Sequence, residues 1–100
     1  MTLDDYQVAA ARTVNEGLSQ QEKLLDGAAG AAEEAGEVLA HIRKHVFQKR
    51  ELDRQRLAEE LGDVLWCVAA VATAAGVSLD TIGQSNIEKL RARYPGGLKT

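Results

Sequence analysis

Apolar residues recur every three or four positions along most of this chain, which is the spacing of amphipathic helices. The pattern predicts four helical segments: one over about 3–16, one from about 19 to the basic residues 43–45, one from about 53 to 76, and one from about 78–80 to 95. No alternating strand pattern competes with it, and the connections between the segments are short. The sequence therefore predicts an all-α protein built as an antiparallel, four-helix bundle-like fold.

Residues with known preferences for helix ends stand at most of the predicted boundaries. Thr2 and Asp53 are suitable N-caps, and Gly17 and Gly76 are suitable stops. The fourth segment begins at Ser78 or Asp80 and ends before the Pro-Gly-Gly of 95–97. Its apolar positions are expected to face inward: Leu79, Ile82, Ile87 and Leu90.

The second segment contains both a strong start signal and an internal weakness. Ser19 and Glu22 have the spacing of a capping box. Gly27 and Gly30 lower helix propensity a few residues later, so the helix is expected either to break there or to restart after Asp26.

Length, composition and charge restrict the class of protein. The chain has 100 residues, enough for one domain over 1–95 followed by a short tail over 96–100. The net charge of −3 argues against a partner that is a nucleic acid polymer. There is one cysteine, no signal-peptide pattern and no apolar run long enough to span a membrane, so we expect a cytoplasmic protein.

An internal repeat carries the chemical information. Residues 32–39 read AEEAGEVL and residues 58–65 read AEELGDVL, with six of the eight positions identical. Each copy lies in a predicted helix, and these two helices are consecutive. Each copy also contains a glycine, Gly36 or Gly62, which predicts a close approach of a partner helix or a ligand to the backbone at that point.

The repeat places acidic pairs on one face of each helix. Glu34 and Glu37 are three residues apart, as are Glu60 and Asp63, so each pair shares a face. Antiparallel packing would turn the four carboxylates toward one another. Two unit charges ~4 Å apart repel by ~4 kcal/mol at an effective dielectric constant of ~20, so such a group needs protons or cations.

Hard divalent cations, which prefer oxygen ligands, are the natural counter-ions for this group. The repeat contains no histidine or cysteine, which disfavours zinc, although His41 one turn after Glu37 leaves a di-iron site open. The site is therefore predicted to hold Mg²⁺, with Mn²⁺ as a substitute. The simpler alternative is that these glutamates are solvated surface residues in a chain rich in alanine and glutamate.

With these residues identified, the sequence resembles the MazG-like family of all-α nucleoside triphosphate pyrophosphohydrolases. The family pattern of E-E-x-x-E followed by E-x-x-D is present as Glu33, Glu34, Glu37 and then Glu60, Asp63. The segments YQVAAART at 6–13, ELGDVLW at 60–66 and NIEKLRARYP at 86–95 are also similar to the family. One departure is Cys67, at a position where the family often has an aromatic residue.

The resemblance implies a function and a set of roles. It implies hydrolysis of (deoxy)nucleoside triphosphates to monophosphate and pyrophosphate, in nucleotide-pool house-cleaning, by a homodimer or a dimer of dimers. It implies that the metal ligands are Glu34, Glu37, Glu60 and Asp63, with Glu33 as an accessory catalytic carboxylate. Positive and polar side chains should face the triphosphate, and the candidates are Lys44, Asn86, Lys89 and Arg93.

Two alternatives stay open at this point. A phosphoribosyl-ATP pyrophosphohydrolase would have a similar bundle and similar acidic motifs. A helical interaction module without catalysis would use its alanine-rich faces only for assembly. The identity of the base and sugar is not readable from the sequence.

Overall fold

The computed structural model of the protein describes residues 1–97 and contains four helices and no strands in that range. They are α1 (Leu3–Ala11), α2 (Gln20–Phe47), α3 (Arg54–Ala75) and α4 (Leu79–Arg93). The all-α prediction is confirmed. Of the predicted tail over 96–100, residues 98–100 lie outside the described residues. Within the described part of the chain, no single helix combines the length and the apolar character needed to cross a membrane.

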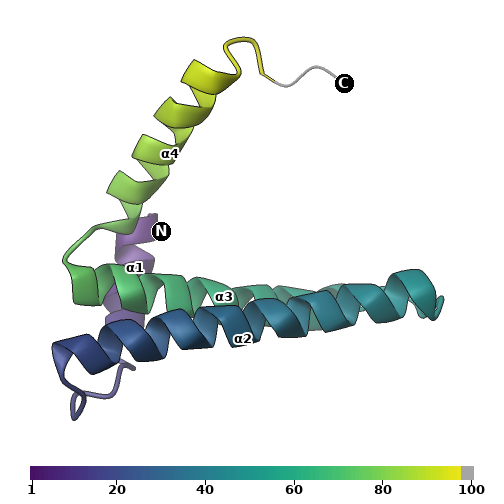
Figure 1. Ribbon diagram of the computed structural model, residues 1–100, viewed down its shortest axis with the longest axis horizontal. Coiled ribbons are helices and arrows are strands. Elements are labelled where there is room, and N and C mark those ends of the chain that lie inside the picture. The colour runs from purple at the N-terminus through teal and green to yellow at the C-terminus, as the bar shows by residue number, and fades with distance from the viewer. Residues whose placement is uncertain (98–100) are drawn as a thin grey trace.

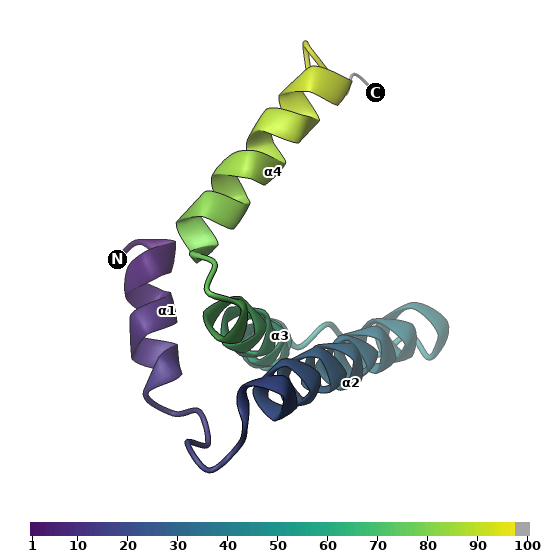
Figure 2. The same cartoon turned by 60° about the vertical axis from the view of Figure 1, so that its left-hand side comes forward.

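The helices of one chain do not close into a compact bundle. α2 and α3 run side by side as a long antiparallel hairpin, and α1 lies across one end of it (Figures 1 and 2). α4 leaves α3 at a bend of 103° and packs mainly against α1, so it projects away from the hairpin. The radius of gyration is 16.1 Å, against about 13 Å for a typical compact domain of this length. Large helix faces therefore remain without a partner within residues 1–97.

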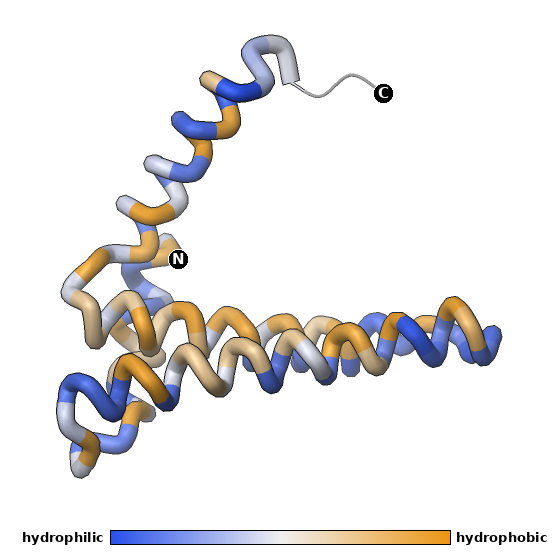
Figure 3. Tube along the Cα trace, in the orientation of Figure 1, coloured by the Kyte–Doolittle hydropathy of each residue, from blue (hydrophilic) through white to orange (hydrophobic). Residues whose placement is uncertain are grey.

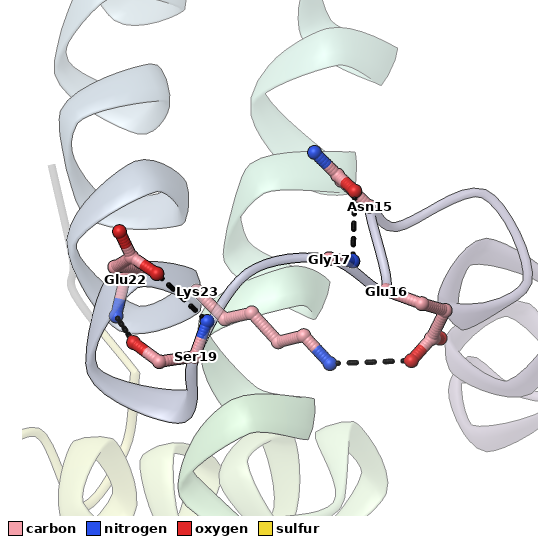
Figure 4. A network of polar contacts seen from close by, with 6 residues as sticks. All are labelled: Asn15, Glu16, Gly17, Ser19, Glu22 and Lys23. Carbon is pink, nitrogen blue, oxygen red and sulfur yellow. Dashed lines mark hydrogen bonds and ion pairs between the residues drawn. The ribbon is translucent and has the colours of Figure 1, made fainter.

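The predicted caps are present at all four helix starts. At the first, Thr2 Oγ1 accepts from the Asp5 N–H at 3.0 Å. Ser19 Oγ accepts from the Glu22 N–H at 3.1 Å, while Glu22 Oε1 accepts from the Ser19 N–H at 2.9 Å, which completes a capping box (Figure 4). These bonds stabilise the ionised carboxylate and lower the pKa of Glu22. Asp53 caps α3 and Ser78, rather than Asp80, caps α4.

The first helix is shorter than predicted, because it ends at Ala11 instead of near Glu16. The Thr13 hydroxyl donates to the Ala10 carbonyl at 2.7 Å, and Asn15 Oδ1 accepts from the Gly17 N–H at 2.9 Å (Figure 4). Short polar side chains that bond the nearby backbone in this way offer the chain an alternative to continued helix.

The second helix runs unbroken through Gly27 and Gly30, so the predicted interruption there is wrong. A Cβ atom at Gly27 would lie 2.8 Å from Val71 Cγ2 and 3.3 Å from the Val71 nitrogen. A Cβ atom at Gly30 would lie 2.9 Å from Cys67 Sγ. These glycines therefore allow the backbones of α2 and α3 to approach closely, and that packing offsets their low helix propensity.

The buried core is small and consists mostly of short side chains. Within the described residues it comprises Ala10, Cys67, Ala69, Ala72 and Leu79. Trp66 packs against its edge and its Nε1–H donates to Thr13 Oγ1 at 2.7 Å. Trp66 therefore joins α3 to the end of α1, whereas Cys67 packs against Gly30 of α2.

A glutamine on α1 fixes the start of α4. Gln7 Nε2 donates to Thr73 Oγ1 and to the Val77 carbonyl, and Gln7 Oε1 accepts from the Leu79 N–H at 2.7 Å. Asp4 Oδ1 also accepts a hydrogen bond from the Asp80 N–H, in the first turn of α4, at 2.9 Å. These contacts hold the junction but leave the rest of α4 unsupported.

The apolar face of α4 is not turned inward as the sequence predicted. Leu79 is buried, but Ile82, Ile87 and Leu90 are each about two-fifths exposed. Figure 3 shows apolar and polar residues alternating along α4 where it stands away from the other helices. The periodicity is that of a helix with a packed face, but the chain supplies no surface to pack against it.

Gly27→Ala should destabilise the protein, because the added methyl group meets the stiff Val71 side chain and its backbone. We expect overpacking to exceed the gain in helix propensity, for a net loss of about 1 kcal/mol in the free energy of unfolding. Gly36→Ala is the matched control, since nothing lies within 4 Å of a Cβ atom there. It should gain about 0.5–1 kcal/mol. Denaturant melts measure both, and a loss of stability in the control would contradict the open surroundings of Gly36.

Candidate metal centre

The close approach of α2 and α3 determines which acidic residues face each other. Gly30 lies against Cys67, and the two helices are antiparallel. One turn further along α2 and one turn back along α3, Glu34 comes opposite Asp63. Asp63 is the strongest of the negative charges acting on Glu34, which agrees with this register. The repeated motifs therefore meet across the helix pair.

The four predicted metal ligands line one cleft of about 510 Å³ between α2 and α3. They are Glu34, Glu37, Glu60 and Asp63. Glu59 also lines the cleft, whereas Glu33, its counterpart in the repeat, does not. Glu33, the accessory carboxylate of the motif, thus lies outside the cleft that contains the four predicted metal ligands. Its charge still contributes to the negative potential at Glu34.

One carboxylate of the cleft, Glu34, has a raised pKa. Partial desolvation raises the pKa of Glu34, and the charges of Asp63, Glu37, Glu33 and Glu60 raise it further. No lysine or arginine forms an ion pair with these carboxylates in residues 1–97. A site of this kind favours a bound cation, because a cation removes the repulsion that the protons would otherwise relieve.

Glu60 has an unusual environment. Its Oε1 atom lies 2.8 Å from His41 Nδ1, and both side chains are largely shielded, at 13% and 10% exposed. The same oxygen forms no hydrogen bond of acceptable geometry and is buried. The His41 nitrogen lies close to this oxygen, but no N–H is directed at it. A lone pair of Glu60 Oε1 is therefore available to bind a cation. From the sequence alone the role of His41 stayed open, and its proximity to Glu60 comes from the tertiary structure.

The side chains present fit a hard divalent cation in their donor chemistry. They supply carboxylate oxygens from two helices and one buried oxygen that lacks a hydrogen bond. Within the described residues, no three acidic, histidine or cysteine side chains converge closely enough to hold an ion as they stand. Mutual repulsion of uncompensated carboxylates gives a physical reason for this spread.

The predicted substrate-binding residues fall into two groups. Lys44 lines a second cleft that shares Glu37 and Glu60 with the first. Asn86, Lys89 and Arg93 lie on α4, and none of them lines either cleft. One chain therefore does not bring α4 to its own carboxylates. Sequence reasoning also missed Arg56, which lines both clefts and could have been found one turn before Glu60 on the same helix face.

Comparison with known proteins assigns this arrangement to a family. A family model described as the MazG nucleotide pyrophosphohydrolase domain matches residues 22–98, which include both acidic motifs. The chain belongs to the MazG family. The predicted resemblance is thereby confirmed at the level of the family.

Two relatives of the MazG-family chain have sequences similar over much of their length. Gene 37 protein of Mycobacterium phage L5 is 35% identical over 112 aligned positions, which cover 98% of this chain and 93% of the relative. The uncharacterized protein YvdC of Bacillus subtilis strain 168 is 34% identical over 71 positions, which cover 62% of this chain and 67% of the relative. No solved structure gives a significant match.

Glu34→Gln should change how stability depends on pH. Because the pKa of Glu34 is raised in the folded state, folding binds a proton between the ordinary value of 4.5 and the raised one. The contribution of Glu34 is thus most favourable at low pH and becomes unfavourable as pH rises through the folded-state pKa. Without metal, we expect Glu34→Gln to melt higher than the wild type near about pH 7, and the difference to shrink toward about pH 4.

The measurement is a series of thermal melts in chelator. Glu16→Gln is the control for loss of one negative charge, since Glu16 lies in the α1–α2 connection and its ion pair with Lys23 is exposed (Figure 4). A difference between Glu34→Gln and wild type that stays constant with pH would contradict the crowding of carboxylates around Glu34.

Proposed function

We propose that this protein is a Mg²⁺-dependent nucleoside triphosphate pyrophosphohydrolase, for which Mn²⁺ substitutes. It would convert (deoxy)nucleoside triphosphates to monophosphate and pyrophosphate, in nucleotide-pool house-cleaning. The observation that carries the proposal is the cleft between α2 and α3, which four carboxylates of the two acidic motifs line without an ion pair to any lysine or arginine in residues 1–97. Membership of the MazG family supports the reaction class.

The proposed roles follow the position of each side chain. Glu34, Glu37, Glu60 and Asp63 hold the metal. Glu33 lies outside the cleft and is the accessory carboxylate, acting through its charge on Glu34. A bound divalent cation supplies charge neutralisation at the phosphates and lowers the pKa of water. His41 limits the motion of Glu60 through their 2.8 Å contact.

The reaction is a displacement at phosphorus. The oxygen of water forms a bond to the α-phosphorus, and the bond from that phosphorus to the α,β-bridging oxygen breaks. The proton of the attacking water passes to a carboxylate of the cleft or to solvent, and pyrophosphate leaves with the electron pair of the broken bond. The protein chain contributes position and charge, and forms no covalent bond to the substrate.

We further propose that the active enzyme is a homodimer or a dimer of dimers. Two features of the chain support this: the exposed apolar face of α4 and the separation of α4 from the carboxylate cleft. A second copy that covers α4 would bury the exposed Ile87 and Leu90. It would also place Asn86, Lys89 and Arg93 of one copy at the carboxylates of the other.

Glu37→Gln and Asp63→Asn should each abolish activity. Each replacement removes one negative ligand from a cation site with no spare charge, so we expect a loss of at least ~100-fold in pyrophosphate release. The assay is pyrophosphate release from a panel of canonical and modified nucleoside triphosphates, with Mg²⁺, with Mn²⁺ and with chelator. Glu16→Gln is the control and should keep full activity. Full activity in either cleft variant would refute the assignment of the site.

The same assay separates the proposal from its alternatives. Release from phosphoribosyl-ATP alone would assign the other pyrophosphohydrolase reaction. Failure to release pyrophosphate from any of these, in folded protein whose melting temperature does not rise with metal, would favour an interaction module without catalysis.

A mixing experiment tests whether α4 acts on the site of another copy. Asp63→Asn and Lys89→Ala are each expected to be inactive or nearly so. If α4 acts across the interface, a mixed dimer contains one site with intact carboxylates and an intact α4. Random reassembly of equal amounts should then recover roughly a quarter of wild-type activity. Activity equal to the sum of the separate variants would show that Lys89 acts within its own chain or not at all.

A further inference from the structure

A second cleft of about 220 Å³, here called the loop-end cleft, lies at the loop end of the α2–α3 hairpin, next to the carboxylate cleft. Its lining has mixed charge, with the basic side chains of Lys44, Arg50 and Arg56 and the acidic side chains of Glu37, Glu51, Asp53 and Glu60. The two clefts are continuous, since they share four of these residues: Glu37, Asp53, Arg56 and Glu60. A ligand held at the carboxylates can therefore extend directly into the loop-end cleft, where the basic side chains lie.

The loop that carries Arg50 is anchored over the end of α2. His45 Nδ1 lies 2.7 Å from the Arg50 carbonyl oxygen, and because a carbonyl only accepts, this nitrogen is the donor. The Arg50 N–H donates to the Lys44 carbonyl at 3.4 Å. Lys49 between them has a positive φ of 53°, which turns the chain back toward the helix. These contacts hold the backbone of Arg50 in place over the end of α2.

None of the three basic side chains of this cleft forms an ion pair within residues 1–97, where the pairs are Lys23–Glu16 and the His41–Glu60 contact. Asp53, three residues before Arg56, uses Oδ1 to accept the Arg56 backbone N–H at the start of α3. The guanidinium groups therefore remain available for an external anion, and their forked N–H groups suit phosphate oxygens.

In α2 and α3, the lysine and arginine residues near the carboxylates lie on one side of them only. α2 contains no lysine or arginine between Lys23 and Arg43, and α3 contains none after Arg56. On the other side of the carboxylates the helix pair instead presents Gly30 and the buried, apolar surroundings of Cys67. All the basic charge that α2 and α3 place near the carboxylates is thus on the loop side.

We infer that the loop-end cleft is the subsite for the leaving pyrophosphate, with Arg50 and Arg56 as its principal ligands and Lys44 beside them. The β- and γ-phosphates of the substrate point toward the loop, the α-phosphate lies at the carboxylates, and the nucleoside extends in the opposite direction. The identity of the ligand rests on the proposed function, whereas the position and charge of the subsite rest on the contacts described above.

The test is direct binding of inorganic pyrophosphate, measured by titration calorimetry in the presence of Mg²⁺. Arg50→Gln and Arg56→Gln should each weaken binding about tenfold or more, and the double variant further, because each loses charged hydrogen bonds to phosphate. Arg54→Gln is the matched control: it removes the same charge from the same helix, but Arg54 lines neither cleft. It should bind pyrophosphate as the wild type does.

A second probe tests the direction of the ligand. Binding of a nucleoside monophosphate, which lacks the leaving phosphates, should change less than twofold in Arg50→Gln and Arg56→Gln. Equal weakening of both probes, equal weakening in Arg54→Gln, or no binding of pyrophosphate to folded wild-type protein would each overturn the inference.

These outcomes are separate from failure of the proposed function. Arginine-dependent pyrophosphate binding by a protein that releases no pyrophosphate from nucleotides would refute the proposed reaction and support the subsite. Nucleotide hydrolysis that persists while the arginine variants bind pyrophosphate normally would support the reaction and refute the subsite.

Discussion

The close contact between α2 and α3 is the constraint on which the rest of the molecule depends. Gly27 and Gly30 let α2 approach Val71 and Cys67 within distances that no larger residue would allow. That contact fixes the register of two long helices, and a register fixed at one end is transmitted along both, because an α-helix is stiff. Everything chemical in this protein lies further along the same two helices.

The register brings negative charges together, and no lysine or arginine in residues 1–97 forms an ion pair that would relieve their repulsion. The carboxylates of the two motifs share a cleft, the pKa of Glu34 is raised, and a buried oxygen of Glu60 lacks a hydrogen bond. Local rules of helix stability and charge pairing fail together at this one place, which is typical of a functional site rather than of a solvated surface. Lys44 and the two arginines of the neighbouring cleft would balance the negative charge of a phosphorylated ligand rather than that of the protein.

The small core and the exposed α4 belong to the same physical picture. A core of three alanines, one cysteine and one leucine buries little apolar area, and a chain of this size has few ways to bury more by itself. The apolar stripe of α4 is a regular helical pattern that lacks a partner within residues 1–97. Assembly with a second copy would cover that stripe and complete the proposed site in one step.

The sequence by itself determined the features that depend on neighbouring residues. Helix number and most helix ends followed from periodicity and from caps such as Ser19 and Asp53, whose bonds reach only three residues along the chain. The repeated acidic motif also gave the family and the four residues that line the carboxylate cleft, since residues three apart share a helix face wherever the helix is placed.

Only the tertiary structure decided the features that depend on contacts between helices. Gly27 and Gly30 look like helix breakers in the sequence, and packing against α3 makes them the closest contact instead. The inward face predicted for α4 is exposed, because periodicity shows that a face will be covered but not whether the covering surface belongs to the same chain. The proximity of His41 to Glu60, and the direction of charge given by Arg50 and Arg56, likewise arise from how two helices and a loop meet in space.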